Sequence, residues 1–265
     1  MLLSVVLGAV IGVVLALTGA GGGILAMPLL MLALHLPPQQ AAPVSLIAIG
    51  LAAGVGSVLG LREGIVRYRA ALMIGIMGMV SAPLGVWLSA RVPARPLLLG
   101  LAALLTWVAW QQWRQASGPT SRPDGPQPPC VLHPQEGRLI WTSPCAQALA
   151  GTGLLSGLLS GLAGVGGGFI IIPSLARNTD LDWRQIQATA LSVIALVALS
   201  GVSAAAIQGH VPLQNAGPFA LGTLASLLLT RRWAQRLPVT PLRRTFAALC
   251  AVSAGLLVFR GLGWL

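Results

Sequence analysis

The segment that decides the fold is GAVIGVVLALTGAGGGILAMP, from Gly8 to Pro28, which recurs 145 residues later as GLLSGLLSGLAGVGGGFIIIP, from Gly153 to Pro173. The two copies agree at 8 of 21 positions, namely six glycines, one leucine and the proline. A long-range repeat of this kind indicates two halves that share one fold. We interpret residues 1–115 as one membrane repeat, residues 146–265 as the other, and residues 116–145 as a polar linker.

A weaker similarity continues after each glycine cluster. Gln40-Ala41 and Ser45 match Gln187-Ala188 and Ser192, but only if the spacing between the halves grows by two residues. With that shift, the sequence predicts that Gln40 and Ser45 have the same positions in the first half as Gln187 and Ser192 have in the second.

The composition excludes a water-soluble protein. Of the 265 residues, 55% are hydrophobic and 8% are charged, with a mean hydropathy of +0.84, whereas soluble domains have roughly 25% charged residues. The net charge of +11 comes from arginines that lie between apolar segments, as in membrane-protein loops, so we do not expect nucleic-acid binding. We expect residues 2–27 to belong to the mature fold, since no basic residues precede them.

Apolar runs of membrane-spanning length account for most of the chain. Each half has one apolar stretch interrupted by glycines and then three further runs: 2–18, 23–35, 41–61, 70–90 and 97–113, then 146–162, 167–176, 186–207, 213–230 and 245–262. About 20 residues are needed to cross a bilayer as a helix. The predicted fold is an all-α polytopic membrane protein with eight to ten membrane segments.

Arginine placement predicts the topology. If each glycine-broken stretch crosses once, the arginines divide nine against seven; if it reverses, they divide thirteen against three, with only Arg91, Arg95 and Arg260 on the poorer side. The positive-inside rule favours reversal, with a cytoplasmic linker, periplasmic termini and an inverted second half. Whether each broken stretch is a re-entrant hairpin or two short crossings is left open.

Inverted repeats with interrupted helices are typical of secondary transporters. A helix that begins at a glycine cluster presents unpaired N–H groups, which attract anions. We expect Pro28 and Pro173 to kink the helices that follow. Close helix packing is the alternative explanation for the glycines, and it accounts well for Gly8 and Gly12. The predicted substrate-binding residues are Gly19, Gly21, Gly22, Gly23, Gln40, Ser45, Gly164, Gly166, Gly167, Gly168, Gln187, Thr189 and Ser192.

The chemistry-bearing residues favour passive transport over catalysis. No acidic residue falls inside an apolar run, so a proton relay has no carboxylate, and a negative cell interior can drive anion export instead. The runs contain no catalytic set, so we expect neither an enzyme nor a cofactor. We interpret Cys130, Cys145 and Cys250 as ordinary thiols, and we expect no metal site. A channel, an importer and a homodimer are left open.

At these residues the chain resembles the TauE/SafE family of sulfite and organosulfonate exporters. The resemblance rests on the doubled GxGGG...P motif, on the Gln-Ala...Ser segment after each copy, and on the Arg-x-Pro turns at Arg91 and Arg236. It implies a bacterial inner-membrane permease for small sulfur-containing oxyanions or related carboxylates. The family segment Ala-Val-Gly-Thr-Ser is replaced here by Ala42-Pro43-Val44-Ser45 and Thr189-Ala190-Leu191-Ser192, so Thr189 is the hydroxyl that could replace the family threonine.

Overall fold

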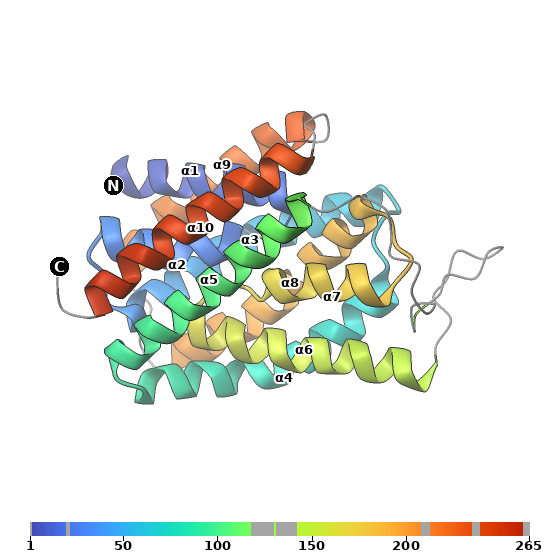
Figure 1. The fold of residues 1–265 in the computed structure, drawn as a ribbon, viewed down its shortest axis with the longest axis horizontal. Helices are drawn as coiled ribbons and strands as arrows, with labels where there is room; N and C mark the ends of the chain where they lie inside the picture. Colours follow the sequence, from blue (N-terminus) through green and yellow to red (C-terminus); the bar gives the residue numbers. More distant parts are fainter. Residues whose placement is uncertain are drawn as a thin grey trace.

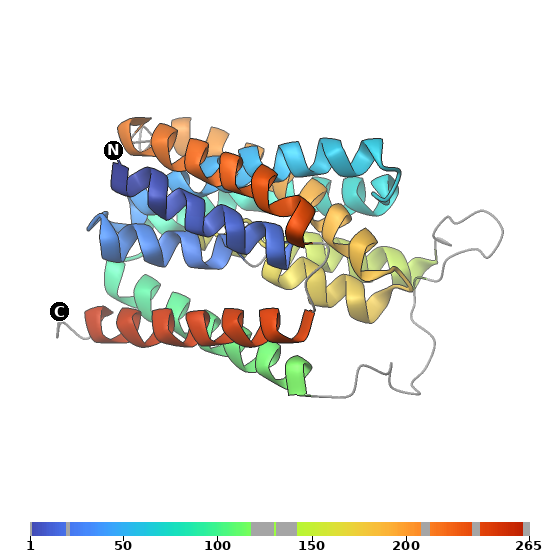
Figure 2. The same cartoon turned by 90° about the horizontal axis from the view of Figure 1, so that it is seen from above.

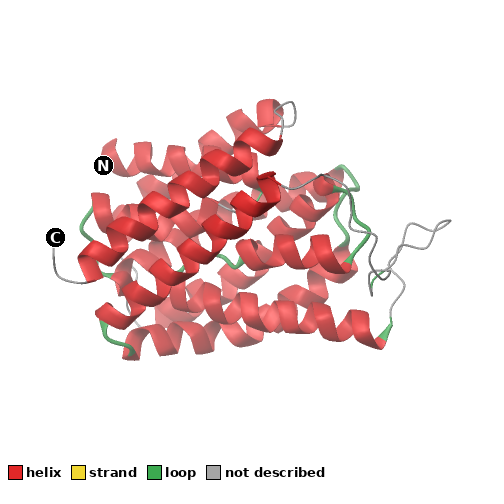
Figure 3. Ribbon diagram, viewed as in Figure 1, coloured by secondary structure: helices red, strands yellow, loops and turns green. Residues whose placement is uncertain are grey.

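Ten α-helices form the described part of the protein (Figures 1 and 3). The computed structural model describes residues 2–19, 22–117, 130, 142–207, 213–234 and 239–261. The helices are α1 (Leu2–Thr18), α2 (Gly22–Ala33), α3 (Pro38–Arg62), α4 (Tyr68–Arg91), α5 (Ala94–Ser117), α6 (Ser143–Ala163), α7 (Gly168–Asn178), α8 (Trp183–Ile207), α9 (Leu213–Ala234) and α10 (Val239–Gly261). The predicted all-α class is confirmed.

The helix boundaries repeat at one constant spacing. α8 begins 145 residues after α3 begins and ends 145 residues after α3 ends, and α4 and α9, as well as α5 and α10, begin at the same spacing. The two-residue shift that the sequence predicted is therefore wrong: Gln187 corresponds to Ala42, and Ser192 corresponds to Ile47. The shifted match between short Gln, Ala and Ser segments is not reflected in the backbone.

Each half opens with a helical hairpin, and the two hairpins point in opposite directions. Hairpin 1 consists of α1 and α2, and hairpin 2 consists of α6 and α7. The first turn of α1 and the last turn of α10 lie at one end of the molecule, called here the terminal end, while the end of α5 and the start of α6 lie toward the opposite end, called the linker end (Figures 1 and 2). α2 has 12 residues and α7 has 11, so at 1.5 Å per residue each is roughly 17 Å long, too short to cross about 30 Å of hydrocarbon. Neither short helix can cross the bilayer by itself, which favours re-entrant hairpins over two full crossings.

The long helices α3 and α8 form the antiparallel centre of the fold. Ser57 of α3 is hydrogen-bonded to Ser192 of α8 at 2.7 Å, and Leu46 of α3 lies against Gly201 near the other end of α8. α1 packs beside α9, and α6 packs beside α4. Each of these pairs joins one half to the other, and the two pairs are equivalent by the repeat. This arrangement is an inverted repeat, with its pseudo-two-fold axis in the membrane plane.

Glycines bring the outer helix pairs together. A Cβ atom at Gly8 would lie 2.1 Å from the Phe219 carbonyl oxygen, and one at Gly157 would lie 2.2 Å from the Gly78 carbonyl oxygen. Only glycine permits such backbone contact, as in other membrane helix pairs. The packing explanation for Gly8 is confirmed, and Gly12 packs in the same way on Thr223 and Ser226.

The outer surface is apolar, as a bilayer requires. Large hydrophobic side chains on several helices are more than half exposed: Leu51, Val80, Leu84, Leu155, Leu199, Leu221 and Leu229. Among the described residues, four helices are long and apolar enough to cross a membrane, namely α3, α4, α6 and α8. Because an exposed apolar belt is unstable in water, the protein is a multi-pass membrane protein.

The arginines of the described chain divide between the two ends as predicted. Ten lie at the linker end and three, Arg91, Arg95 and Arg260, at the terminal end. At the linker end, Arg231 of α9 forms an ion pair with Glu63, just after α3, at 2.8 Å. At the terminal end, the Arg91 guanidinium lies 3.9 Å from the centroid of the Trp87 ring, an arrangement suited to a membrane interface.

A disulfide fastens the linker to the open end of hairpin 2. Cys130 is bonded to Cys145 in the first turn of α6, and the Cys130 N–H donates to the Asn178 carbonyl at 3.0 Å. The prediction of ordinary thiols is wrong for this pair, because the chain returns from the linker onto the ends of α6 and α7. Cys250 is a buried free thiol.

Candidate functional site

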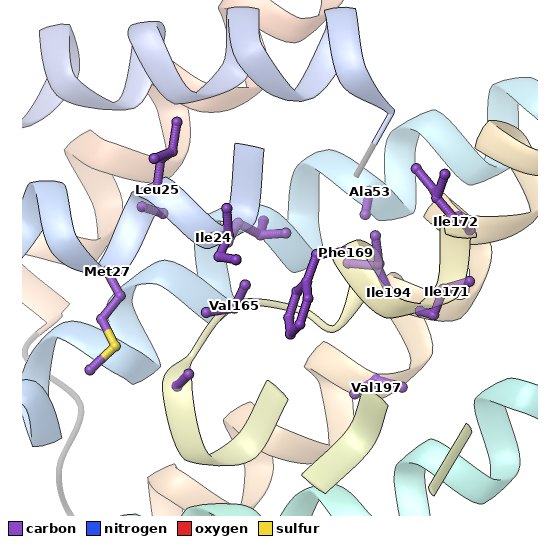
Figure 4. Packing of buried hydrophobic residues seen from close by; sticks show 14 of the residues in the cluster. Ile24, Leu25, Met27, Ala53, Val165, Phe169, Ile171, Ile172, Ile194 and Val197 are labelled. Carbon is purple, nitrogen blue, oxygen red and sulfur yellow. The ribbon is translucent and has the colours of Figure 1, made fainter. Parts of the chain in front are cut away.

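The tips of the two hairpins meet inside the molecule. A Cβ atom at Gly23, in the first turn of α2, would lie 2.1 Å from the carbonyl oxygen of Val165 in the tip of hairpin 2. Figure 4 shows Ile24, Val165 and Phe169 close together at this junction, and all three are buried. The N-termini of α2 and α7, which enter from opposite ends of the protein, are therefore neighbours.

The tip of hairpin 1 turns at Gly19. This residue has a φ of +78°, a left-handed conformation that favours glycine, and its N–H donates to the Leu15 carbonyl at 2.8 Å. A Cβ atom at Gly19 would lie 2.6 Å from Cγ of Gln187 on α8. The structure thus brings together two of the predicted site residues. Gly22 packs on the backbone of α1, and Gly21 lies outside the described residues.

The tip of hairpin 2 has three glycines at positive φ. Gly164 ends α6 at +63°, and Gly166 and Gly167 follow at +78° and +70°. Gly164 lies against Ala42 of α3, the residue that corresponds to Gln187, and the Ser45 hydroxyl donates to the Gly164 carbonyl. Ser45 therefore lies at the tip of hairpin 2, and its role in substrate binding stays a prediction.

The start of α7 is enclosed by both halves. Gly166 lies between the side chains of Ile49 and Ile194, Gly167 is the N-cap and Gly168 is the first helical residue. A Cβ atom at Gly167 would lie 2.7 Å from the Ser156 carbonyl oxygen of α6. The space beside these glycines is occupied by protein, so this conformation is closed.

Three predicted site residues lie away from the tips. Gln40 is exposed near the start of α3. Thr189 accepts a hydrogen bond from the backbone N–H of Arg67 at 3.1 Å, so it holds the loop between α3 and α4 against α8. Ser192 donates to the Ala188 carbonyl and pairs with Ser57. Thr189 and Ser192 therefore have structural partners in the closed conformation, whereas Gln40 is exposed.

The predicted kinks lie at prolines within short helices. Pro28 is inside α2 and Pro173 is inside α7, and both helices continue beyond them. Each proline lacks an N–H, so the carbonyl four residues earlier loses its usual donor. The kinks themselves stay a prediction.

Sequence reasoning missed Arg67 as a site residue, because it counted only as a loop charge. Arg67 precedes α4, its backbone bonds to Thr189, and its Nε is buried without a hydrogen-bond partner among the described residues. Arg67 therefore brings a positive charge next to α8, where its backbone is bonded to Thr189. No periodicity or motif in the sequence distinguishes this arginine from its exposed neighbours Arg62 and Arg69.

Titratable clusters are absent from the described hairpins. None of the five acidic residues lies in any of the ten helices. In the described ranges, no group of three or more His, Cys, Asp or Glu side chains could hold a metal. His133 lies outside those ranges.

Comparisons with known proteins agree with this architecture. The family model described as sulfite exporter TauE/SafE matches residues 4–257. Two curated relatives, each described as a probable membrane transporter protein, come from Xylella fastidiosa strains 9a5c and Temecula1 / ATCC 700964. Each is 30% identical over 175 residues, which is 66% of this chain and 62% of the relative. No solved structure matches the chain significantly.

Proposed function

This chain belongs to the sulfite exporter TauE/SafE family of membrane transporters, and we propose that it is a secondary transporter that exports a small anion across the bacterial inner membrane. The anion is sulfite, an organosulfonate, or a related oxyanion or carboxylate. The matched segment spans about three fifths of the length of its curated relatives, and their description as transporters supports transport without naming a substrate.

The meeting of two re-entrant hairpin tips is the observation that carries the proposal. Each tip begins a helix, α2 or α7, whose first N–H groups lack helical acceptors and carry partial positive charge. Such helix ends bind anions in water-free surroundings without a full charge. Because the tips come from opposite ends of the protein, an anion between them can be released to either side.

The closed packing favours a carrier over an open pore. Gly19 is covered by Gln187, and Gly164 by Ala42, so a hairpin must move before an anion reaches the amide groups. Left-handed glycines at the base of each tip permit such movement with little steric cost. Movement at a hairpin tip would expose the site to one side at a time.

Arginine placement supports an orientation with the linker end in the cytoplasm. The Cys130–Cys145 disulfide argues for the other orientation, because disulfides persist in oxidising compartments. We give more weight to the arginines, since ten of the thirteen described ones lie at the linker end, whereas a single cysteine pair can be reduced in the cell. In this orientation, a negative interior favours outward movement of each charge by about 2.3 kcal/mol per 100 mV.

Sulfite flux in proteoliposomes tests the proposal. We expect saturable sulfite efflux that accelerates when the cytoplasm-equivalent side is made negative and that ignores an imposed pH gradient. Flux that follows the pH gradient and ignores voltage would refute potential-driven export. Flux that does not saturate and shows no counter-flow stimulation would indicate an anion channel.

A further inference from the structure

Hydroxyl groups line the interior of hairpin 2 from the linker end to its tip. The Asn178 amide donates to the Ser174 hydroxyl at 3.2 Å, and Ser174 is hydrogen-bonded to Thr152 of α6 at 2.5 Å. Ser156 and Ser160 follow Thr152 at intervals of four residues, so they lie on the same side of α6. Together these five residues, called here the hydroxyl column, connect the end of α7 with the glycine tip.

The inner end of the hydroxyl column is incompletely satisfied. Ser156 lies against Gly167. A Cβ atom added at Gly167 would lie 3.0 Å from the Cβ atom of Ser156. The Ser160 hydroxyl is fully buried and has no hydrogen-bond partner among the described residues. A buried hydroxyl without a partner destabilises the closed state, so Ser160, one turn beyond Ser156 on α6, is a position at which a ligand or water would supply the missing bond.

Hairpin 1 has no equivalent column. At the constant spacing of 145 residues, the column positions Thr152, Ser156, Ser160, Ser174 and Asn178 correspond to Leu7, Ile11, Leu15, Leu29 and Ala33. All five are apolar. The difference cannot follow from the backbone, which is repeated, so it is a property of the side chains of hairpin 2 alone.

A pocket lies on the other side of the same tip. It is lined by Gln39 and Ala42 of α3, Ser89 of α4 and Gly161 of α6, among others. Ala42 also touches Gly164, so the pocket lies directly beside the tip of hairpin 2. The pocket lies toward the terminal end, because it uses the first turns of α3 and the last turns of α4.

We propose that the transported oxyanion passes through hairpin 2 only, along the hydroxyl column to its tip and then into the pocket toward the terminal end. This inference rests on the proposed function and adds the path that the anion takes through the protein. Thr152 and Ser156 donate to the Ala148 and Gly153 carbonyls of their own helix in the closed state, and on turning to the oxyanion these hydroxyls would bind it without adding a fixed charge that would retain it. Ser160 and the first amides of α7 hold it at the tip, and the tip separates the two sides.

Cysteine accessibility tests the path without requiring a known substrate. In a chain with Cys250→Ala, the remaining native cysteines are in the disulfide, and Ser174→Cys and Ser156→Cys are compared with their equivalents Leu29→Cys and Ile11→Cys. Intact proteoliposomes receive a sulfonate-bearing or a trimethylammonium-bearing methanethiosulfonate reagent from either side. Each rate is divided by the rate of the reagent with a free thiol in solution.

We expect the anionic reagent to modify Ser174→Cys and Ser156→Cys from the linker side at least about ten-fold faster than their equivalents, because thiolates form only where water reaches. Equal rates in the two hairpins, or a cationic reagent that reacts as fast as the anionic one, would overturn the proposal. If the column is labelled but sulfite does not move, the path stands and the substrate is wrong. If sulfite moves and the column is not labelled, the path is wrong.

Discussion

Hairpins 1 and 2 have the same backbone arrangement and differ in the side chains between their two helices. Both turn at left-handed glycines, both contain a proline in the short returning helix, and both lie against the long central helices. The positions of hairpin 1 that correspond to the hydroxyl column are apolar, whereas in hairpin 2 they carry hydroxyls and one amide. A duplicated scaffold can thus keep its packing in both copies while only one copy acquires the polar groups that a solute needs.

The largest expected effect concerns the tip of hairpin 2. Gly164→Ala places a Cβ atom 2.4 Å from Cα of Ala42 at a φ of +63°, which should destabilise the protein by roughly 3 kcal/mol. Thermal unfolding in detergent measures the loss. The matched control is Gly54→Ala in α3, where no atom lies within 4 Å and helix propensity should leave stability equal or slightly higher. Equal stability of the two variants would contradict the tight contact at the tip.

A second difference between the hairpins is the Cys130–Cys145 disulfide, which holds hairpin 2 alone and can be removed by mutation. Cys130→Ser removes the disulfide to Cys145, and the two cysteines are 15 residues apart in the sequence. Loss of a disulfide that closes a loop of this length should lower the free energy of unfolding by about 3 kcal/mol. Hydrogen exchange should rise in the first turn of α6 and the last turn of α7 while α1 and α2 stay protected. Unchanged exchange would mean that the pair is not bonded in the purified protein.

Ser160→Ala should weaken sulfite binding without lowering the stability of the protein. The hydroxyl has no partner in the closed state, so its removal should leave the unfolding temperature equal or higher. A lost hydrogen bond to a charged solute is worth about 1.5–3 kcal/mol, so the KM for sulfite should rise at least about ten-fold. Ser81→Ala is the control, since Ser81 donates to the Leu154 carbonyl at 2.8 Å and its loss should lower stability with little change in KM. The reverse pattern would remove Ser160 from the site.

The smallest expected effect tests whether the positive charge of Arg67 also contributes to anion binding. Arg67→Gln removes the incompletely paired cation beside Thr189 and should raise the KM for sulfite about five-fold, through a loss of roughly 1 kcal/mol of attraction. Arg69→Gln, at an exposed position in the first turn of α4, should have no effect. If both variants behave alike, the effect of Arg67 is one of net charge and not of a local site.

The sequence predicted the backbone well and the polar contacts poorly. Glycine clusters, apolar run lengths and arginine sidedness are properties of long segments, and they correctly predicted the reversal at Gly19 and Gly164. The error at Ser192 came from aligning isolated polar residues in helices where Ala, Leu and Ser are abundant. The environment of Arg67 and the missing partner of Ser160 depend on contacts between distant helices, which no local pattern reports.

The most direct test of the central claim is an experimental structure with a bound oxyanion. Selenite, a heavier analogue of sulfite, gives an anomalous signal that identifies its position. We predict a selenium peak at the meeting hairpin tips, on the hairpin 2 side, within hydrogen-bond distance of the first amides of α7 and of the Ser160 hydroxyl. A peak remote from both tips, in a protein that transports selenite, would contradict the account.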